Sequence, residues 1–445
     1  MRRPPQWSGL ARLPGLEGRL PDGGRDAVVL TTAGSLGDLY PVLSVARALE
    51  AAGIEARLAL SPDDVAVARR WGLDATPIGP SAAEIERRLG LGRDEIAASV
   101  LRDPSPILRD LAIPMAEALV YDLAPLVDGA GAVAATLLAL SAPLAAERAG
   151  VPFVPLALQP MLTFAPSDPP GIEPIRRIVV PAPGRLGRAW NRAVLRVARA
   201  ELSRRHRGDL DALRARLGLP PGSGTPLVDD PPADLRIGLW DPDFAPAPPD
   251  GPPGLEVVGF PPAPPSSADD PAVARWMEDG APALVVTLGS AAHRIGPRGF
   301  WAGAVDAARR LGMRAVLLHG EAAVPEGPDI LAKPYAAHAA LFPLAGAILH
   351  HGGIGTTAEA LRAGKPQLVM PVGGDQPDNA ARLRRMGAAA VLAPRRFSGA
   401  RAAQALHGLL AGFDHEAAQA RGARMAARDG AAEAALRIAR VALRS

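Results

Sequence analysis

The stretch HHGGIGTT at residues 350–357 decides the fold, together with Glu359 and with GGDQP at residues 373–377. It follows an apolar run, Ala347–His350, which predicts a buried strand, and it opens a helical segment. Glycines let a backbone come close to a ligand, and the free N–H groups of a helix N-terminus attract an anion. The pattern therefore indicates a strand–turn–helix unit that binds a phosphate group.

The polar side chains around this turn suit a nucleotide diphosphate. Thr356 supplies a hydroxyl donor, and an imidazole at His351 can donate a hydrogen bond to a diphosphate. Glu359 lies one turn further along, where its carboxylate can accept hydrogen bonds from ribose hydroxyls. Asp375 and Gln376 follow the next strand, at the edge of a parallel sheet where ligands bind. The alternative is a plain glycine-rich turn with surface polar residues, and the complete set argues against it.

Near the amino terminus the chain repeats the same kind of unit. Ala27–Thr32 predicts a strand, Gly34–Asp38 a turn, Pro41–Ala52 a helix and Ile54–Leu60 a second strand. Such a βαβ unit implies a parallel sheet with helices on its faces. Further strands are predicted at Ala132–Leu137, Ala283–Leu288, Ala315–His319, Gln367–Pro371 and Ala388–Leu392.

The length of 445 residues and a hydrophobic content of 48% predict two domains with large cores. The densest proline stretch, Asp241–Pro271, is typical of a linker between them. We therefore expect an α/β protein with two Rossmann-like domains whose parallel sheets face each other across a cleft. The expected parts are a flexible extension (1–26), a first domain (27–240), the linker (241–271), a second domain (272–425) and a C-terminal helix that can pack back on the first domain (426–445).

Composition excludes several classes of protein. The chain has no cysteine, which rules out disulfides, thiolate catalysis and cysteine-based zinc sites. The pI near 9.7 accompanies a net charge of only +3, because almost all the basic residues are arginines and few groups titrate above neutral pH. We therefore expect no nucleic-acid partner. No cluster of His, Asp and Glu has metal-ligand spacing, so we expect no metal site, and His293, His319, His338 and His350 are expected to be packed or hydrogen-bonded.

Two segments bear on membranes. Gly129–Ala146 is uncharged, but it contains Pro143 and is rich in Ala and Gly, so we expect a buried strand and a helix rather than a span. Arg176–Arg207 holds ten arginines interleaved with apolar residues. It predicts either a solvated helical face or a basic amphipathic surface that rests on anionic lipid. We expect a cytoplasmic protein, with peripheral contact at the inner face of the membrane as the second possibility.

The motifs together resemble those of a known family. HHGGIGTT followed by GGDQPDNAAR (373–382) is similar to the donor-sugar signature of family 1 glycosyltransferases, which have the GT-B fold. GSLGDLYP (34–41), VTLGS (286–290) and EVVGFP (256–261) resemble further motifs of this family. Within the family, the sequence looks most like the bacterial rhamnosyltransferases that act on hydroxyacyl lipids, a group similar to bacterial macrolide and sterol glycosyltransferases.

The resemblance implies a role for each donor-site residue. The residues that would hold the nucleotide sugar are Ser290, Tyr335, His351, Gly353, Gly355, Thr356, Glu359, Asp375 and Gln376. The chain departs from the family pattern at Lys333, where plant members have tryptophan, and at Ala337, where bacterial relatives often have proline. Whether the nucleobase is uracil or thymine therefore stays open. Gly374 replaces a histidine of many rhamnosyltransferase-like relatives, which weakens rhamnose as the sugar.

The first domain would bind the acceptor. Asp38 falls three residues before Pro41, where many relatives carry the catalytic histidine, and a carboxylate beside an apolar cleft can act as a general base. Alternatively, Asp38 caps a helix that begins near Tyr40 or Pro41, and the two roles can coexist. Gly34, Ser35 and Tyr40 are expected to line the cleft.

The resemblance implies an inverting, metal-independent hexosyltransferase without a cofactor. It would move a hexose or deoxyhexose from a UDP- or dTDP-sugar to a hydroxyl of an apolar acceptor such as a hydroxyacyl lipid, a sterol or a polyketide. Two alternatives remain open at this point. One is a nucleotide-sugar epimerase of the same fold, and the other is a non-catalytic homologue that binds a nucleotide sugar.

Overall fold

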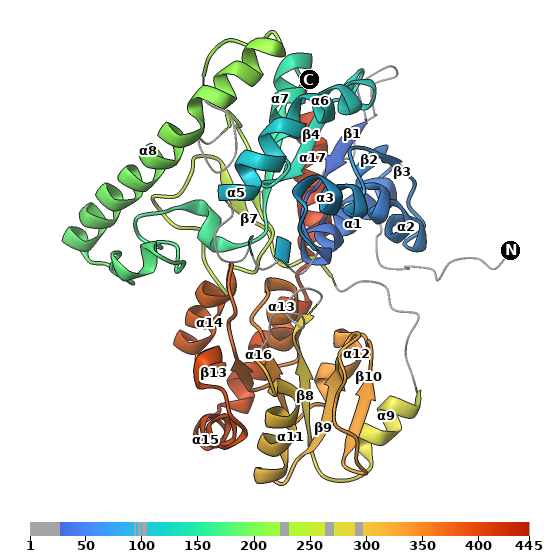
Figure 1. Ribbon diagram of the computed structural model, residues 1–445, viewed down its shortest axis with the longest axis vertical. Helices are drawn as coiled ribbons and strands as arrows, with labels where there is room; N and C mark the ends of the chain where they lie inside the picture. Colours follow the sequence, from blue (N-terminus) through green and yellow to red (C-terminus); the bar gives the residue numbers. More distant parts are fainter. Residues whose placement is uncertain are drawn as a thin grey trace, which may run out of the picture.

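The computed structural model describes residues 27–92, 95–96, 99, 105–222, 231–262, 271–289 and 297–444. The chain forms two lobes, one above the other in Figure 1, and each lobe is built around its own parallel sheet. The predicted fold class, two Rossmann-like units with parallel sheets, is confirmed. The predicted extension at 1–26 lies outside the described residues.

The first sheet has seven strands in the order β3-β2-β1-β4-β5-β6-β7, and every neighbouring pair is parallel. Its central strands are almost entirely buried and rich in Ala, Val and Leu, as expected for a parallel sheet covered on both faces. The strands are β1 (Val28–Thr31), β2 (Ala56–Leu60), β3 (Ala75–Pro77), β4 (Ala132–Thr136), β5 (Phe153–Ala157), β6 (Arg236–Gly238) and β7 (Leu255–Val257).

The second sheet has six parallel strands in the order β10-β9-β8-β11-β12-β13. In both sheets the strand order reverses beside the first strand of the unit, between β1 and β4 and between β8 and β11. Ligands of such sheets bind outside the carboxyl ends of the strands at this switch point. The strands are β8 (Ala283–Thr287), β9 (Arg314–Leu318), β10 (Ile330–Lys333), β11 (Ala347–His350), β12 (Gln367–Val369) and β13 (Ala389–Val391).

Helices cover both faces of each sheet (Figure 1). The first lobe holds α1 (Leu36–Ala51), α2 (Pro62–Arg70), α3 (Ala82–Leu89), α5 (Ser105–Ile107), α6 (Ile113–Val127), α7 (Ser141–Ala149) and α8 (Arg185–Arg216), with a π-turn at Leu108–Ala112 and 3₁₀ turns at Pro160–Thr163 and Ile175–Arg177. The second lobe holds α9 (Pro271–Glu278), α11 (Phe300–Arg310), α12 (His338–Leu341), α13 (Ile354–Arg362), α14 (Gln376–Arg385), α15 (Gly399–Leu410) and α16 (His415–Ala426), with 3₁₀ turns at Phe342–Leu344 and Pro394–Arg396.

The chain crosses between the lobes twice, and the crossings lie side by side. The N–H of Gly430 donates to the carbonyl of Phe260 at 3.2 Å. After the second crossing, α17 (Gly430–Ala442) packs its buried alanines and Ile438 into the core of the first lobe. The predicted linker at 241–271 contains β7, which pairs with β6 as the edge strand of the first sheet. The first sheet therefore extends past residue 240.

The uncharged segment around residue 140 folds as predicted. It forms the buried strand β4 and then α7, rather than one long apolar helix. Within the described part of the chain, no helix has the length and apolar character needed to cross a bilayer.

Candidate functional site

The glycine-rich turn connects β11 to α13 and leaves the start of this helix open. Gly352 adopts a φ of +91°, and a Cβ there would lie 2.8 Å from Cγ1 of Val369, so the turn requires glycine. Gly353 is the N-cap residue, and no side chain caps the helix. Gly355 is exposed, with open space where a Cβ would be. The N–H groups of the first turn therefore remain available for an anion.

His351 lies against the glycines of this turn. A Cβ on Gly353 would lie 2.4 Å from Nε2 of His351, and a Cβ on Gly289 would lie 2.6 Å from its Cε1. Burial, together with the neighbouring His350 and His338, lowers the pKa of His351 to about 3, so the imidazole is neutral. Within the described residues its Nδ1 atom is buried and has no hydrogen-bond partner. A buried polar atom of this kind is available to hydrogen-bond with a ligand.

His350, in contrast, has a structural role. Its Nδ1 accepts a hydrogen bond from the N–H of Gly352 at 3.1 Å, so its Nε2 donates to Oε1 of Gln367 at 2.9 Å. The ring is fully buried, and it fixes the glycine turn to the neighbouring strand β12. His338 stacks on Phe342 with ring centroids 4.4 Å apart. These two histidines are packed or hydrogen-bonded, as predicted.

Glu359 lies on α13 one turn beyond the glycines and forms an ion pair with Arg362. Arg362 also donates to the carbonyls of Phe260 and Pro261, at 2.9 and 2.7 Å. Burial raises the pKa of Glu359, while Arg362 counteracts this rise. The carboxylate is therefore held in place by a residue that binds the crossing segment between the lobes.

Asp375 and Gln376 lie at the start of α14, after β12. Nδ2 of Asn379 donates to Oδ2 of Asp375 at 2.8 Å and to the carbonyl of Gly352 at 2.9 Å, which connects α14 to the glycine turn. Oε1 of Gln376 accepts from the N–H of Val372 at 2.7 Å. Burial, and to a lesser extent the charge of Asp38, raises the pKa of Asp375 to about 7.

In the first lobe, Asp38 belongs to the first turn of α1, which follows β1. The helix begins at Leu36, five residues before the predicted start, and its N-cap is Ser35. The Oδ2 atom of Asp38 accepts hydrogen bonds from N–H of Ser35 at 2.8 Å and from its hydroxyl at 3.2 Å. This is a capping box, so Asp38 supports the helix start as the third helical residue and not as the N-cap. A Cβ on Gly34 would lie 2.3 Å from Oδ2 of Asp38.

Burial raises the pKa of Asp38 to about 6, even though Ser35 donates to its carboxylate. Besides burial, the charge of Asp38 contributes to the raised pKa of Asp375, and Tyr335 contributes to the raised pKa of Tyr40. The start of α1 in the first lobe therefore lies within electrostatic reach of Asp375, which Asn379 joins to the glycine turn of the second lobe. Tyr40 also stacks on Trp71, with ring centroids 5.4 Å apart.

Of the predicted site residues, the structure brings His351, Gly353 and Asp375 together around the glycine turn. Tyr335 is exposed over 63% of its surface, whereas Thr356 is buried. Ser290 and His293 lie outside the described residues. In the described part of the chain, no three His, Asp or Glu side chains come together as a metal site.

One contact between the lobes was not predicted. Arg382 on α14 donates to Asp378 at 2.7 Å and to Asp168 of the first lobe at 2.8 Å, and Asp378 accepts from the N–H of Gly171 at 2.9 Å. The Asp168 and Arg382 positions are 214 residues apart, so no local pattern in the sequence reveals the pair. The contact holds the loop after β5 against α14, the helix that begins directly after Asp375.

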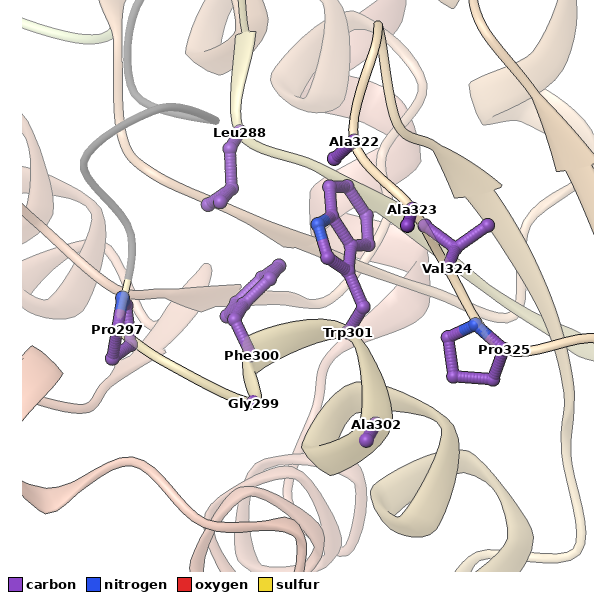
Figure 2. A pocket seen from close by; sticks show the side chains of 10 residues that line it. All are labelled: Leu288, Pro297, Gly299, Phe300, Trp301, Ala302, Ala322, Ala323, Val324 and Pro325. Carbon is purple, nitrogen blue, oxygen red and sulfur yellow. The ribbon is translucent and has the colours of Figure 1, made fainter. Parts of the chain in front are cut away.

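A pocket of about 440 Å³ lies at the carboxyl ends of β8 and β9. Figure 2 shows Trp301 and Phe300 on one side and the segment 322–325 on the other. Its lining residues are all of apolar types, and none of the predicted site residues that the structure describes is among them. The lining residues are Leu288, Pro297, Gly299, Phe300, Trp301, Ala302, Ala322, Ala323, Val324 and Pro325.

Comparisons with known proteins agree with this architecture. Residues 303–440 match the family "Erythromycin biosynthesis protein CIII-like, C-terminal domain". The chain is 33% identical over 379 residues to O-mycaminosyltylonolide 6-deoxyallosyltransferase of Streptomyces fradiae, covering 82% of this chain and 84% of that protein. It is 28% identical over 377 residues to vancomycin aglycone glucosyltransferase of Amycolatopsis orientalis, covering 81% and 84%.

Solved structures show the same fold. The glycotransferase of kitacinnamycin superposes with a TM-score of 0.69 at 20% identity, over 94% of this chain and 99% of that chain. The glycosyltransferase VinC in complex with dTDP superposes with a TM-score of 0.66 at 24% identity, over 94% and 100%. At these identities the likeness concerns the fold alone.

Proposed function

The chain belongs to the family 1 glycosyltransferases of the GT-B fold, and on that premise we propose that it moves a hexose or deoxyhexose from a UDP- or dTDP-sugar to a hydroxyl of an apolar acceptor, with inversion at the anomeric carbon. The second lobe would hold the nucleotide sugar, and the first lobe would hold the acceptor. Transfer would need neither a metal ion nor a cofactor.

One observation carries the proposal: two helix starts of different electrostatic character lie at the carboxyl ends of the two sheets, and the charge of Asp38 in one of them acts on Asp375 beside the other. The start of α13 is uncapped and lies beside the neutral imidazole of His351, which suits a diphosphate. The start of α1 holds Asp38, whose raised pKa of about 6 suits a general base near neutral pH. A sugar bound between them would have its leaving group at one helix and its attacking hydroxyl at the other.

The reaction is a single displacement. The acceptor O–H gives its proton to the carboxylate of Asp38, and the acceptor oxygen forms a bond with the anomeric carbon. The bond from that carbon to the diphosphate oxygen breaks, and its electron pair leaves with the diphosphate. The N–H groups at the start of α13 and a ring N–H of His351 would stabilise the charge that develops there. Attack from the face opposite the leaving group inverts the configuration.

The remaining site residues would position the donor. Glu359, held by Arg362, would accept from the ribose hydroxyls, and Asp375 would accept from the sugar hydroxyls. Since Oε1 of Gln376 already accepts from the Val372 N–H, its amide NH₂ is the part that would reach the sugar. Tyr335 would contact the nucleobase, and Ser290 the diphosphate, as the family resemblance implies.

Two details rest on the relatives. The solved neighbours VinC and the spinosyn rhamnosyltransferase SpnG are described as complexes with thymidine diphosphate, which favours thymine over uracil for this chain. The names of the curated relatives refer to a mycaminosyltylonolide and to the vancomycin aglycone, which favours a natural-product acceptor over a hydroxyacyl lipid or a sterol.

The test is a panel of UDP- and dTDP-sugars incubated with polyketides, sterols and hydroxyacyl lipids, with products identified by mass spectrometry. We expect a glycosylated product with at least one dTDP-sugar, unchanged by EDTA, and an NMR coupling constant that reports the inverted anomer. Loss of activity with EDTA would refute metal independence, and the retained anomer would refute single displacement. A donor sugar epimerised without an acceptor would identify the chain as an epimerase instead. Binding of dTDP without turnover on any donor would identify it as a non-catalytic homologue.

A further inference from the structure

The long helix α8 has two opposite apolar faces, and only one of them is packed. Its inner face buries Asn191, Leu195 and Leu213 against the first lobe. Leu186, Trp190 and Val197 follow one another at helical spacing, about 140–180° around the helix from Leu195. They are exposed over 88, 53 and 70% of their surfaces. Figure 1 shows α8 standing out from one side of the first lobe.

The segment that precedes α8 extends this apolar surface. Ile178 and Val180 are exposed over 49 and 42% of their surfaces. The indole Nε1 of Trp190 donates to the carbonyl of Ile178 at 2.8 Å, so the two residues are adjacent. We call Ile178, Val180, Leu186, Trp190 and Val197 the α8 patch. Five large apolar side chains gathered at one protruding edge indicate an interaction surface.

The orientation of this helix is fixed, so the patch cannot turn inward. Nδ2 of Asn191 donates to the carbonyls of Pro166 and Val180, each at 2.9 Å. At the other end of the helix, the buried guanidinium of Arg214 donates to Glu147 at 2.9 Å through Nη1. Two anchors on the inner face therefore keep the patch directed outward.

The charge around the patch is strongly positive. Residues 175–216 contain twelve arginines against Glu201, Asp209 and Asp211, a net charge of +9, whereas the whole chain carries +3. Arg185, Arg196 and Arg207 are spaced eleven residues apart, so they form a row along one side of the apolar stripe. Arginine side chains can lie along an apolar surface while their charged heads reach outward.

We propose that the α8 patch docks the protein on the surface of a bilayer that contains anionic phospholipids. A narrow apolar stripe with a tryptophan and flanking arginines is the pattern of helices that lie in the interface plane. The arginines are attracted to the anionic headgroups, and Leu186, Trp190 and Val197 insert among the acyl chains. This inference does not depend on the proposed sugar transfer.

Docking would also place the membrane near the site. The inner face of α8 holds the loop after β5 through Asn191 and Pro166, and Asp168 in that loop pairs with Arg382 on α14. The same loop thus lies between the α8 patch and the helix that begins beside Asp375. An apolar acceptor dissolved in a bilayer would enter the first lobe from this side.

The test is flotation of the full chain with phosphatidylcholine vesicles, with and without phosphatidylglycerol. We expect the chain to float only with the anionic vesicles and to be released by high salt. Leu186→Gln/Val197→Gln and Arg185→Gln/Arg196→Gln should each lower the partition coefficient about tenfold or more. The matched controls, Leu91→Gln and Arg395→Gln/Arg396→Gln, change exposed residues away from α8 and should bind like the unmodified chain.

Calorimetric titration with dTDP checks that every variant is folded. Because the substitutions lie away from the proposed donor site, the affinity for dTDP should be unchanged. A chain that stays unbound with both kinds of vesicle would overturn the docking proposal, and so would α8 variants that float like the controls. Equal binding to neutral vesicles would refute the role of the arginines. Self-association that is lost in Leu186→Gln/Val197→Gln, without vesicle binding, would show that the patch joins two copies. Retention on heparin without flotation would identify an acidic macromolecule as the partner.

Discussion

The helix starts of α1 and α13 are built on the same plan but differ in charge. Each follows a buried parallel strand at the switch point of its sheet, and each contains glycines that admit a close contact. The start of α1 is closed by the capping box of Ser35 and Asp38, which places a carboxylate there. The start of α13 has no side-chain cap and carries no carboxylate in its first turn.

The same supersecondary unit can therefore serve two chemical tasks. A capped start has its N–H groups occupied and presents an acid, so it can take a proton but repels a diphosphate. An uncapped start presents N–H groups and attracts a diphosphate, but it offers no group that takes a proton. Exchanging the features of the two starts should therefore damage different steps of the reaction.

The largest effect is expected from Asp38→Asn, which removes the acid while keeping the capped start. Asparagine still offers an oxygen to the N–H of Ser35, so the melting temperature should change little. Turnover at saturating donor should fall on the order of a hundredfold or more, the usual size of general-base catalysis. The measurement is the initial rate of transfer together with dTDP affinity, which should be unchanged.

The matched control for this variant is Ser35→Ala, which weakens the cap and leaves the carboxylate. It should lower the melting temperature by more than Asp38→Asn does, while transfer continues. Near-normal turnover in a folded Asp38→Asn protein would mean that another group takes the proton.

The second prediction gives α13 the acid that it lacks. Gly355 has open space around it, so Gly355→Asp should fold, and a carboxylate in the first turn should stabilise the helix by about 0.3–1 kcal/mol. Its charge would lie beside the diphosphate, where like charges about 4 Å apart repel by about 4 kcal/mol at a protein surface. Affinity for dTDP should therefore fall about a hundredfold or more while the melting temperature rises.

Gly355→Ala controls for the size of the new side chain, since it adds a methyl group without charge. Calorimetry should find nearly normal dTDP affinity in Gly355→Ala. If Gly355→Asp binds dTDP as well as Gly355→Ala does, the diphosphate lies elsewhere.

A third prediction separates the two neighbouring histidines. His351→Ala should keep the fold and lower dTDP affinity about ten- to a hundredfold, because a hydrogen bond to a charged group contributes about 1.5–3 kcal/mol. His350→Ala should instead lower the melting temperature, because the N–H of Gly352 loses its acceptor inside the core. Thermal melts and calorimetry on both variants decide the assignment, and the reverse pattern would exchange the two roles.

The sequence predicted the parts of this comparison that depend on local chemistry. The glycine turn of α13 was predictable because glycines, an apolar strand and a helical segment follow one another within about a dozen residues. The start of α1 was placed five residues too late, because Pro41 resembles a first-turn proline but lies inside the helix. Ser35 and Asp38 together, spaced as a capping box, are the signal that gives the observed start.

The missed features depend on distant parts of the chain. The strands β3, β6 and β10 have three or four residues each, and β3 and β10 are not fully buried, so neither length nor periodicity marks them. The Asp168–Arg382 pair joins the lobes, and no single segment of the sequence contains both partners. The α8 patch was one of two interpretations of its arginine-rich segment, because exposure cannot be inferred from periodicity when both faces of a helix are apolar.

The smallest expected effect concerns Asp375, whose pKa is raised by burial and in part by the charge of Asp38. Burial raises the pKa of Asp375 to about 7 in the folded protein, above the value near 3.9 of an unfolded chain. Between about pH 4 and pH 7 the folded state therefore binds more protons than the unfolded state, so stability falls as the pH rises through this window and levels off above it. Asp38, with a pKa of about 6, contributes in the same direction.

Asp375→Asn removes one of these titrating groups and keeps an oxygen for the hydrogen bond from Asn379. Between about pH 5 and pH 8, on either side of the two raised pKa values, the melting temperature of the unmodified chain should fall more than that of the variant. Asp279→Asn, at an exposed site in the second lobe, should retain the full pH dependence. If the melting temperature of Asp375→Asn falls with pH as steeply as that of the unmodified chain, the carboxyl of Asp375 is already ionised at about pH 5. The two acids would then lie farther apart than the structure indicates.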